Sequence, residues 1–173
     1  ASLIAIPDSY QSPRSYLDTN VGGTLNMLEA VRNCSTIERV VHVSTSETYG
    51  SAQFVPISEN HPLVGQSPYA ASKIAADKFV ESYACSFDLP VVIARPFNTY
   101  GPRQTSRAVI PTVLCQLANG AREIRLGSIH PTRDFNYVED TALGMCQVLS
   151  GSFSPGEVVN IGSGYEISIS DLV

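Results

Sequence analysis

The sequence has no tryptophan, and no apolar run approaches the roughly 20 residues that a membrane-spanning helix needs. Charged residues are only 16% of the 173 positions and the formal net charge is −5, which argues against nucleic-acid binding because that requires a basic surface. The four cysteines are far apart in sequence and form no C-x-x-C pair, so we expect buried, reduced thiols and no metal site. These features predict a soluble, cytoplasmic protein with neither a membrane nor a nucleic-acid partner.

A glycine-rich turn between a first strand and a first helix is also missing. Dinucleotide-binding α/β folds use such a turn to hold the pyrophosphate. The close glycine pairs are Gly22–Gly23, inside a helical pattern, and Gly162 with Gly164, near the end. Either the chain binds no dinucleotide, or the part that would cradle the pyrophosphate has been cut away.

Helical and strand-like patterns alternate along the first half of the chain. Residues 13–33 and 68–87 have helical spacing, while 39–45 and 90–95 are short β-branched runs typical of strands buried on both faces. This alternation predicts an α/β fold with a Rossmann-like, doubly wound parallel sheet.

The second half has a different texture and predicts a smaller α+β lobe. A long loop precedes helices expected at 109–119 and 139–150 and short strands expected at 123–126, 135–138 and 158–162. We place the sheet-containing domain at residues 1–107 and the smaller lobe at 108–173, with an interleaved boundary.

The stretch SPYAASK (67–73) begins the second helix. Ser67 suits the N-cap and Pro68 the first helical position. Tyr69 and Lys73 then share one helix face, with Cβ atoms about 6 Å apart, and a nearby ammonium would lower the pKa of the phenol. By itself a Y-x-x-x-K spacing is weak, since it also occurs by chance in many helices. A stripe at Ala75, Phe79 and Tyr83 is expected to be buried.

Polar side chains follow both predicted strands. Thr45 and Glu47 come directly after the first strand, and RPFNTYGPR, with Asn98 and Arg103, ends the second. Ligands of α/β folds bind at the carboxyl ends of parallel strands, so we expect these groups to face a ligand there, although incidental loop polarity would give the same pattern.

An arginine within the second lobe is a candidate anion ligand. Arg133 precedes a predicted strand and helix, and a guanidinium suits a pyrophosphate. A surface ion pair with Asp134 or Glu139 is the plainer interpretation.

Five stretches in order resemble the extended short-chain dehydrogenase/reductase family, the NAD-dependent epimerases and dehydratases of nucleotide sugars. They are DTNVGGTLNMLEA (18–30), VVHVSTSETYG (40–50), SPYAASKIAADK (67–78), RPFNTYGPR (95–103) and TRDFNYVEDTA (132–142). The resemblance covers essentially the whole chain and implies that it is the C-terminal part of the NAD-binding domain with part of the substrate lobe. The family's glycine-rich turn lies upstream of the matching segment, which explains its absence.

The resemblance also implies roles for individual residues. Tyr69 corresponds to the base that accepts a proton from a sugar hydroxyl, Lys73 to the residue that binds the nicotinamide ribose, and Thr45 to a hydrogen-bond partner of the reacting oxygen. Asn20 and Phe97 match cofactor contacts. Asn98, Arg133 and, less directly, Arg103 match positions that hold the nucleotide diphosphate. The family also implies a homodimer of the full-length parent.

Glu47 distinguishes the branches of the family. A 4,6-dehydratase needs a second base at C5, whereas a simple epimerase does not, so Thr-Ser-Glu favours a nucleotide-sugar 4,6-dehydratase. The closest resemblance is to the UDP-N-acetylglucosamine dehydratases of nonulosonic-acid pathways. Ser46 stands where some dehydratases have the aspartate that protonates the leaving hydroxyl, which leaves that acid unassigned.

Two alternatives remain open. A 4-epimerase or a UDP-glucuronate decarboxylase would share most of these motifs, although decarboxylases usually have an acidic residue soon after the tyrosine, where this chain has YAASK. A non-catalytic fragment is the alternative from another class, since a chain without the phosphate-cradling turn should bind NAD poorly.

Overall fold

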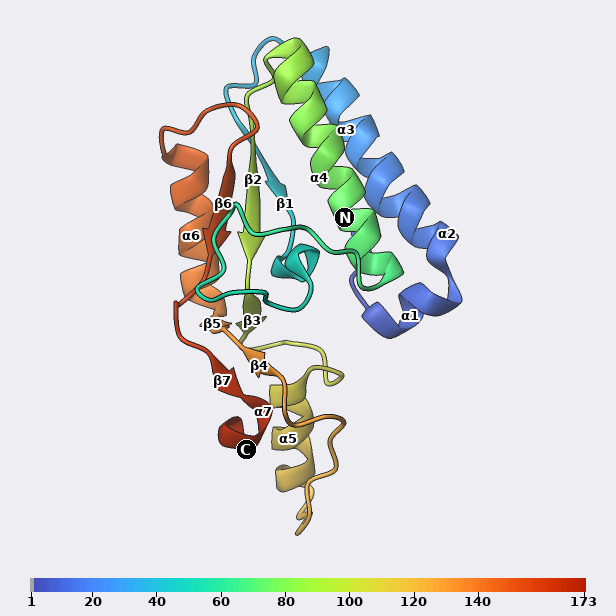
Figure 1. Cartoon of the computed structure of the whole chain (residues 1–173), viewed down its shortest axis with the longest axis vertical. Coiled ribbons are helices and arrows are strands. Elements are labelled where there is room, and N and C mark those ends of the chain that lie inside the picture. Colours follow the sequence, from blue (N-terminus) through green and yellow to red (C-terminus); the bar gives the residue numbers. More distant parts are fainter. Residues whose placement is uncertain (1) are drawn as a thin grey trace. The chain divides into compact units, whose positions relative to one another are not determined.

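The computed structural model describes residues 2–173, which divide into two compact units (Figure 1). Unit 1 comprises the residues up to Pro96 together with Gly144–Ile161, and unit 2 comprises Phe97–Leu143 and Gly162–Val173. This division differs from the expected boundary at 107/108. Residues 97–107 belong to unit 2 because Asn98–Tyr100 pairs with Phe135–Tyr137 there, and the chain returns to unit 1 for the strand at 158–161.

The sheet of unit 1 is parallel and has the order β1-β2-β6. Its strands are β1 (Val40–Val43), β2 (Val91–Pro96) and β6 (Val158–Ile161). Because all three strands run in the same direction, their carboxyl ends meet at one edge, where polar side chains from different segments can converge.

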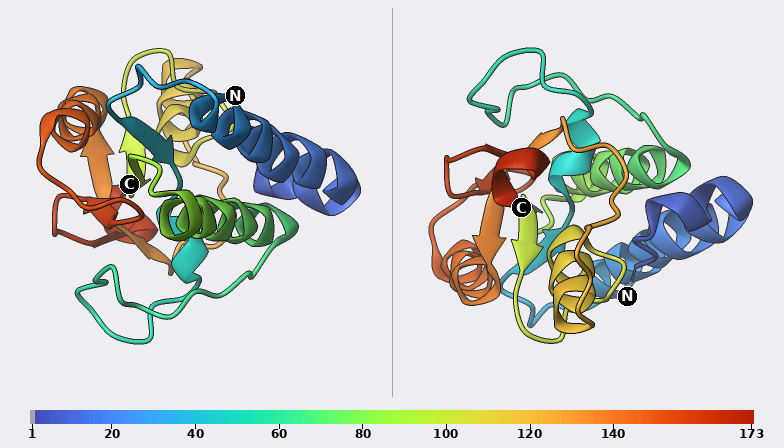
Figure 2. Two further views of the ribbon diagram at one scale, coloured as in Figure 1. Left: turned by 90° about the horizontal axis from the view of Figure 1, so that it is seen from above. Right: turned by 90° about the horizontal axis from the view of Figure 1, so that it is seen from below.

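Helices cover both faces of this sheet, and the central strand β2 is buried on both sides (Figures 1 and 2). Val91 and Ile93 pack with side chains of α3 (Gly23–Arg32) and α4 (Pro68–Phe87) in one core. Val92 and Ala94 pack with Val148 of α6 (Val138–Ser150) in a second core on the other face. This double burial accounts for the unbroken apolar run that predicted the strand.

The expected helix over residues 13–33 consists of three consecutive helical segments. They are α2 (Pro13–Tyr16), a π-helical stretch (Leu17–Gly22) and α3, preceded by the short α1 (Ile6–Gln11). A π-helical stretch accommodates a local deviation from the i→i+4 ladder, and such stretches are frequent at functional sites.

Helix α4 begins and ends as predicted from its sequence. The Ser67 hydroxyl accepts a hydrogen bond from the Ala70 amide at 3.0 Å, which caps the first turn. The predicted buried stripe is wrong, however, since Phe79 is 38% exposed. The face turned inward carries Tyr69, Lys73, Asp77, Val80 and Ala84. This face includes ionisable groups, which an apolar pattern alone could not identify.

Unit 2 has only short strands. Its elements are β3 (Asn98–Tyr100), α5 (Val109–Ala118), β4 (Thr132–Arg133), β5 (Phe135–Tyr137), the first part of α6, β7 (Ile167–Ser168) and α7 (Ile169–Leu172). Strand β3 pairs in parallel with β5, and β4 pairs antiparallel with β7. The strand expected at 123–126 is wrong, because that stretch is irregular.

Two further observations bear on the expectations from composition. Within residues 2–173, no helix has the length and apolarity required to cross a lipid bilayer. The four cysteines are exposed, which corrects the expectation of buried thiols. Those on helices lie at positions turned outward, which helical spacing around one cysteine does not reveal.

Candidate active site

Tyr69 and Lys73 lie on the inward face of α4, against the carboxyl end of β1. The side chains are 7% and 5% exposed, and Lys73 Nζ donates a hydrogen bond to the Val43 carbonyl at 2.7 Å. An ammonium has three N–H donors, so this bond leaves two for another acceptor. Both residues line a cavity of about 430 Å³ in unit 1, together with Asn20 and Ser44.

Thr45 and Glu47 occupy a short turn directly after β1. Thr45 is the N-cap of a 3₁₀ helix (Ser46–Tyr49), and its Oγ1 accepts a hydrogen bond from the Glu47 amide at 3.2 Å. The Thr48 hydroxyl donates to the Thr45 carbonyl at 2.8 Å, and Gly50 ends the turn with a φ of 66°. The turn therefore holds a hydroxyl and a carboxylate in fixed backbone positions at the ligand-binding edge of the sheet.

The acidities of Tyr69 and Lys73 are set mainly by burial. Burial raises the pKa of Tyr69, a hydrogen bond with the Thr45 side chain lowers it, and the charge of Glu47 raises it. Burial lowers the pKa of Lys73, against the nearby charge of Asp77. The expected lowering of the Tyr69 pKa by Lys73 is therefore not seen in the chain, because burial outweighs other influences.

Asn20 lies in the π-helical stretch and is 3% exposed. Its amide group donates to the Leu3 carbonyl and to Ser72 Oγ, both at 3.0 Å, and its Oδ1 accepts from the Leu3 amide at 2.9 Å. Asn20 thus ties the N-terminal segment to α4, and both of its N–H donors are engaged. Its side chain also lines the cavity, so cofactor contact at this position stays a prediction.

Sequence reasoning missed a buried ion pair between Asp77, on the same helix as Tyr69 and Lys73, and Arg95 of β2. Asp77 Oδ2 accepts hydrogen bonds from Arg95 Nε at 3.1 Å and Nη2 at 2.9 Å, and from Ser44 Oγ at 2.9 Å. Burial tends to raise the pKa of Asp77, but the His42 imidazole, the Ser44 hydroxyl and the Arg95 charge outweigh it, so the pKa lies below its ordinary value. The sequence shows only that Asp77 follows Lys73 by four residues and that Arg95 ends an apolar strand, which does not reveal that the two side chains meet.

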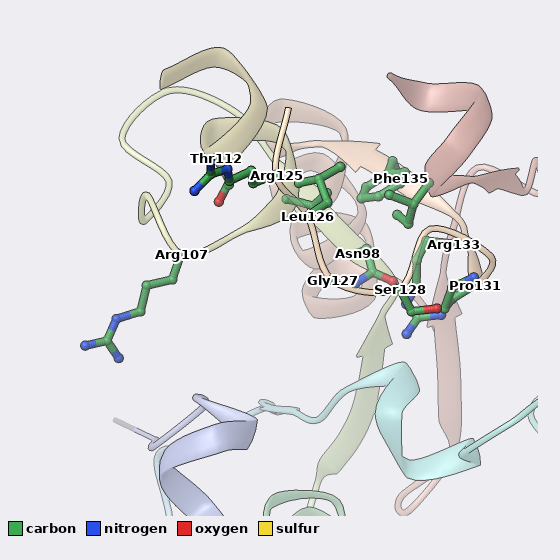
Figure 3. Close-up of a pocket in the computed structure, with 12 residues that line it drawn as sticks. Asn98, Arg107, Thr112, Arg125, Leu126, Gly127, Ser128, Pro131, Arg133 and Phe135 are labelled. Carbon is green, nitrogen blue, oxygen red and sulfur yellow. The ribbon is translucent and has the colours of Figure 1, made fainter. Parts of the chain in front are cut away.

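Unit 2 contains a second cavity, of about 560 Å³, with a cationic lining. Among the residues that the structure describes, none of those lining it is acidic. The polar part is formed by three arginines and by Asn98, Thr112 and Ser128: the arginines are Arg107, Arg125 and Arg133. In Figure 3, Asn98 and Arg133 lie near Ser128 and Pro131, whereas Arg107 extends away from the other labelled side chains.

This cavity brings together two of the predicted diphosphate ligands and leaves out the third. Asn98 and Arg133 both line it, but Arg103 is exposed and does not. Arg133 Nη1 donates to the Thr132 carbonyl at 2.7 Å, and within residues 2–173 no ion pair joins Arg133 to Asp134 or Glu139. The guanidinium is therefore not consumed by the surface pair considered as its plainer role.

Asp134 and Phe97 stabilise the turn that follows β6. The Asp134 carboxylate accepts hydrogen bonds from the Ser163 amide and hydroxyl and from the Gly164 amide, at 2.7–3.1 Å. The Phe97 ring lies against Gly162. These residues belong to unit 2, whereas Tyr69 and Lys73 belong to unit 1, so the cofactor contact of Phe97 stays a prediction.

Comparison with known proteins relates this chain to enzymes that act on nucleotide sugars. A family model described as GDP-mannose 4,6 dehydratase matches residues 1–173. The low-salt glycan biosynthesis protein Agl12 of Haloferax volcanii is 39% identical over 153 residues, which are 88% of this chain and 49% of that protein.

Two solved structures have the same fold with a TM-score of 0.91. One is the dTDP-glucose 4,6-dehydratase DesIV of Streptomyces venezuelae with NAD and TYD bound, 34% identical, covering 99% of this chain and 53% of that one. The other is the UDP-N-acetylglucosamine 4-epimerase of Methanobrevibacter ruminantium M1, 30% identical, covering 99% and 56%. These matches confirm the Rossmann-like fold.

The chain spans about half the length of the relatives that it matches. Its fold agrees with that of both solved structures, over 99% of this chain. The chain therefore belongs to the family of GDP-mannose 4,6-dehydratases, within the NAD-dependent epimerases and dehydratases of the extended short-chain dehydrogenase/reductases.

Proposed function

We propose that the chain carries the catalytic residues of an NAD-dependent nucleotide-sugar 4,6-dehydratase. The observation that carries this proposal is Glu47, whose backbone is fixed by Thr45 and whose charge reaches the phenol of Tyr69. A carboxylate beside the base of the redox step provides a second base, which dehydration requires and epimerisation does not.

We propose that Lys73 and Tyr69, on the wall of the cavity of unit 1, hold the nicotinamide ribose of NAD. Lys73 presents two further N–H donors there, and Tyr69 adds a hydroxyl group, which suits a diol. When bound, NAD supplies oxidation at C4 of the sugar and the later reduction at C6. The chain lacks the glycine-rich turn, so we expect the 173-residue chain alone to bind NAD weakly, and calorimetric titration tests this.

The residues of unit 1 then divide the proton transfers between them. Tyr69 accepts the proton of the C4 hydroxyl as the phenolate, which the positive charge of bound NAD would favour, and Thr45 hydrogen-bonds the same oxygen. The C4 ketone acidifies the C5 proton, which the Glu47 carboxylate removes as water leaves from C6. Ser46 has no group that is acidic near neutral pH, so the protonation of the leaving hydroxyl is not assigned to it.

The cationic cavity of unit 2 suits the diphosphate of the substrate. Arg133, Arg125 and Asn98 can donate several N–H bonds to phosphate oxygens, and the lining also offers apolar surface from Leu126 and Phe135 to a base. The nucleotide is open between dTDP, UDP and GDP. We propose UDP-N-acetylglucosamine as one candidate, on the resemblance of the motifs to dehydratases of nonulosonic-acid pathways.

A 4-epimerase is the second candidate, favoured by the equal TM-score of the epimerase structure. The complete gene product, incubated with NAD and a panel of dTDP-, UDP- and GDP-sugars, distinguishes the two. A 4-keto-6-deoxy product, detected by mass spectrometry as loss of one water, supports the dehydratase. A 4-epimer of unchanged mass, or a pentose from a uronic acid, contradicts it.

We also propose a cytoplasmic homodimer for the complete gene product. The family usually pairs subunits through the tyrosine-bearing helix and the one before it, and α3 and α4 carry the exposed apolar side chains Met27 and Phe79. Light scattering of the complete gene product and of a Phe79→Glu variant tests the dimer, with a monomeric variant as the expected result. Fractionation of the source cells tests the compartment.

A further inference from the structure

The turn that carries Glu47 is anchored at both ends to one buried ion pair. At its start, the Ser44 hydroxyl donates to Asp77 Oδ2 at 2.9 Å. At its end, the Tyr49 hydroxyl accepts from Arg95 Nη1 at 3.0 Å. Asp77 and Arg95 are joined by the two hydrogen bonds given above, so the pair closes a loop around Ser46–Tyr49.

The same pair is fixed to the helix that carries the other catalytic side chains. Asp77 lies on α4, one turn after Lys73 and two turns after Tyr69, and a helix transmits position rigidly over that length. Tyr49 is completely buried, and Asp77 and Arg95 are 2% and 3% exposed. A buried charge that is well hydrogen-bonded has few alternative geometries, so this arrangement favours one position of the turn.

A further branch leads from the pair to the loop that follows the turn. The Tyr49 hydroxyl donates to Asn160 Oδ1 at 2.7 Å, and Asn160 Nδ2 donates to the Ile57 carbonyl at 3.2 Å. The backbone N–H of Asn160 donates to the Glu59 carboxylate at 2.9 Å. The network therefore joins α4, β2, β6, the turn and the loop within unit 1.

We propose that Asp77 and Arg95 are positioning residues for the reaction, which hold Thr45 and Glu47 at a set distance from Tyr69 and Lys73. This inference rests on the proposed function of the same site. It assigns a catalytic consequence to residues that touch neither substrate nor cofactor. The pair acts through Ser44 at one end of the turn and through Tyr49 at the other.

The charge of Asp77 also acts on the groups that face it. These are His42, whose Nε2 lies 3.3 Å from Asp77 Oδ1, Arg95 and, along α4, Lys73 and Tyr69. Tyr49 faces Arg95, and Glu47 faces Tyr69. Since the Asp77 charge raises the pKa of both Tyr69 and Lys73, its removal should lower both.

The test uses the complete gene product with NAD and the nucleotide sugar that it converts. Asp77→Asn should lower kcat by at least about tenfold with little change in KM, because misplacement of reacting groups by a fraction of an ångström costs rate rather than binding. The acidic limb of the kcat–pH profile, which we attribute to ionisation of Tyr69, should move to lower pH because the pKa of Tyr69 falls. Asp77→Glu should restore part of kcat and return the limb toward its original position.

Milder variants keep the test decisive if Asp77→Asn does not fold. Tyr49→Phe removes the hydroxyl that accepts from Arg95 and donates to Asn160, and Ser44→Ala removes only the bond to Asp77. Each should lower kcat several-fold, without moving the acidic limb because Asp77 keeps its charge. Glu81→Gln, which disrupts an exposed ion pair with Lys78 on the same helix, is the matched control and should leave both quantities unchanged.

Amide hydrogen exchange supplies a readout that does not depend on the reaction. Exchange at residues 46–50 should be about tenfold faster in Tyr49→Phe than in the parent or in Glu81→Gln, because a released turn opens more often. Unchanged kcat and exchange in Tyr49→Phe and Ser44→Ala would overturn the proposal. If the protein makes a product other than the dehydrated sugar, the exchange result still decides whether the pair holds the turn.

Discussion

In unit 1 the charges of Asp77 and Arg95 are almost completely buried against each other, whereas in unit 2 Arg125 is exposed and Arg133 half-buried at the wall of a cavity. Helix α4 of unit 1 has eight buried residues, and α5 of unit 2 has none. Catalysis requires side chains whose positions are fixed before the substrate reacts. Binding of a phosphate requires hydrogen-bond donors that remain accessible to it. Substitutions in unit 1 should therefore change kcat, and those in unit 2 should change KM.

The largest effect is expected from Tyr69→Phe. Loss of the phenol hydroxyl removes the base, so kcat should fall by about 10²–10⁴-fold, the usual contribution of acid–base catalysis. Nucleoside-diphosphate affinity, measured by calorimetry, should stay the same. Tyr83→Phe, farther along the same helix, is the control, because the Tyr83 hydroxyl donates a hydrogen bond to Glu29 and Tyr83 does not line the cavity. Residual activity within tenfold of the parent would exclude Tyr69 as the base.

Glu47→Gln should separate the two halves of the reaction. Oxidation at C4 should continue, with accumulation of reduced cofactor visible by absorbance, while loss of water slows by at least about 10². Mass spectrometry of the quenched reaction measures both. Normal dehydration by this variant would remove Glu47 from its proposed role and favour the epimerase.

Arg133→Ala tests the other side of the comparison. Loss of one guanidinium should raise KM for the nucleotide sugar by about tenfold, with kcat changed much less, since charge-assisted hydrogen bonds contribute about 1.5–3 kcal/mol. Arg122→Ala removes an exposed arginine that does not line the cavity and serves as the control. A large fall in kcat with constant KM would contradict a binding role for unit 2.

The smallest effect concerns stability in acid. The folded pKa of Asp77 is lowered, so its contribution is present above the ordinary value of 3.8 and is lost as pH falls through the folded pKa. The free energy of unfolding, measured by urea titration, should therefore decrease below about pH 4. The decrease should be smaller in Asp77→Asn. An identical pH slope in the two proteins would show that Asp77 makes no such contribution.

Local signals in the sequence predicted some parts well and others not at all. Ser67 and Pro68 determine the start of α4 through backbone geometry alone, so the placement of Tyr69 and Lys73 on one face followed from spacing. The placement of Thr45 at the carboxyl end of β1 followed from the rule for parallel sheets. The partnership of Asp77 with Arg95 could not be predicted, because it joins a helix and a strand through tertiary packing.

The remaining failures arise from the surroundings of residues, which a local sequence pattern does not show. The stretch 123–126 has alternating residues typical of a strand, but no neighbouring strand pairs with it in the described chain. The pKa of Tyr69 was expected to be lowered, because the sequence shows a lysine one turn away but not how deeply the phenol is buried. Both errors concern the surroundings of a residue and not the residue itself.

The turn after β1 is held at Ser44, Thr45, Thr48 and Tyr49, and not by the side chains of Ser46 and Glu47. No hydrogen bond or ion pair within the described residues involves the side chains of Ser46 or Glu47. Substitution at these two positions should therefore cost the fold little. An ancestor with this scaffold could have exchanged one sugar reaction for another by changing the middle of a single turn, and a protein engineer could begin at the same two positions.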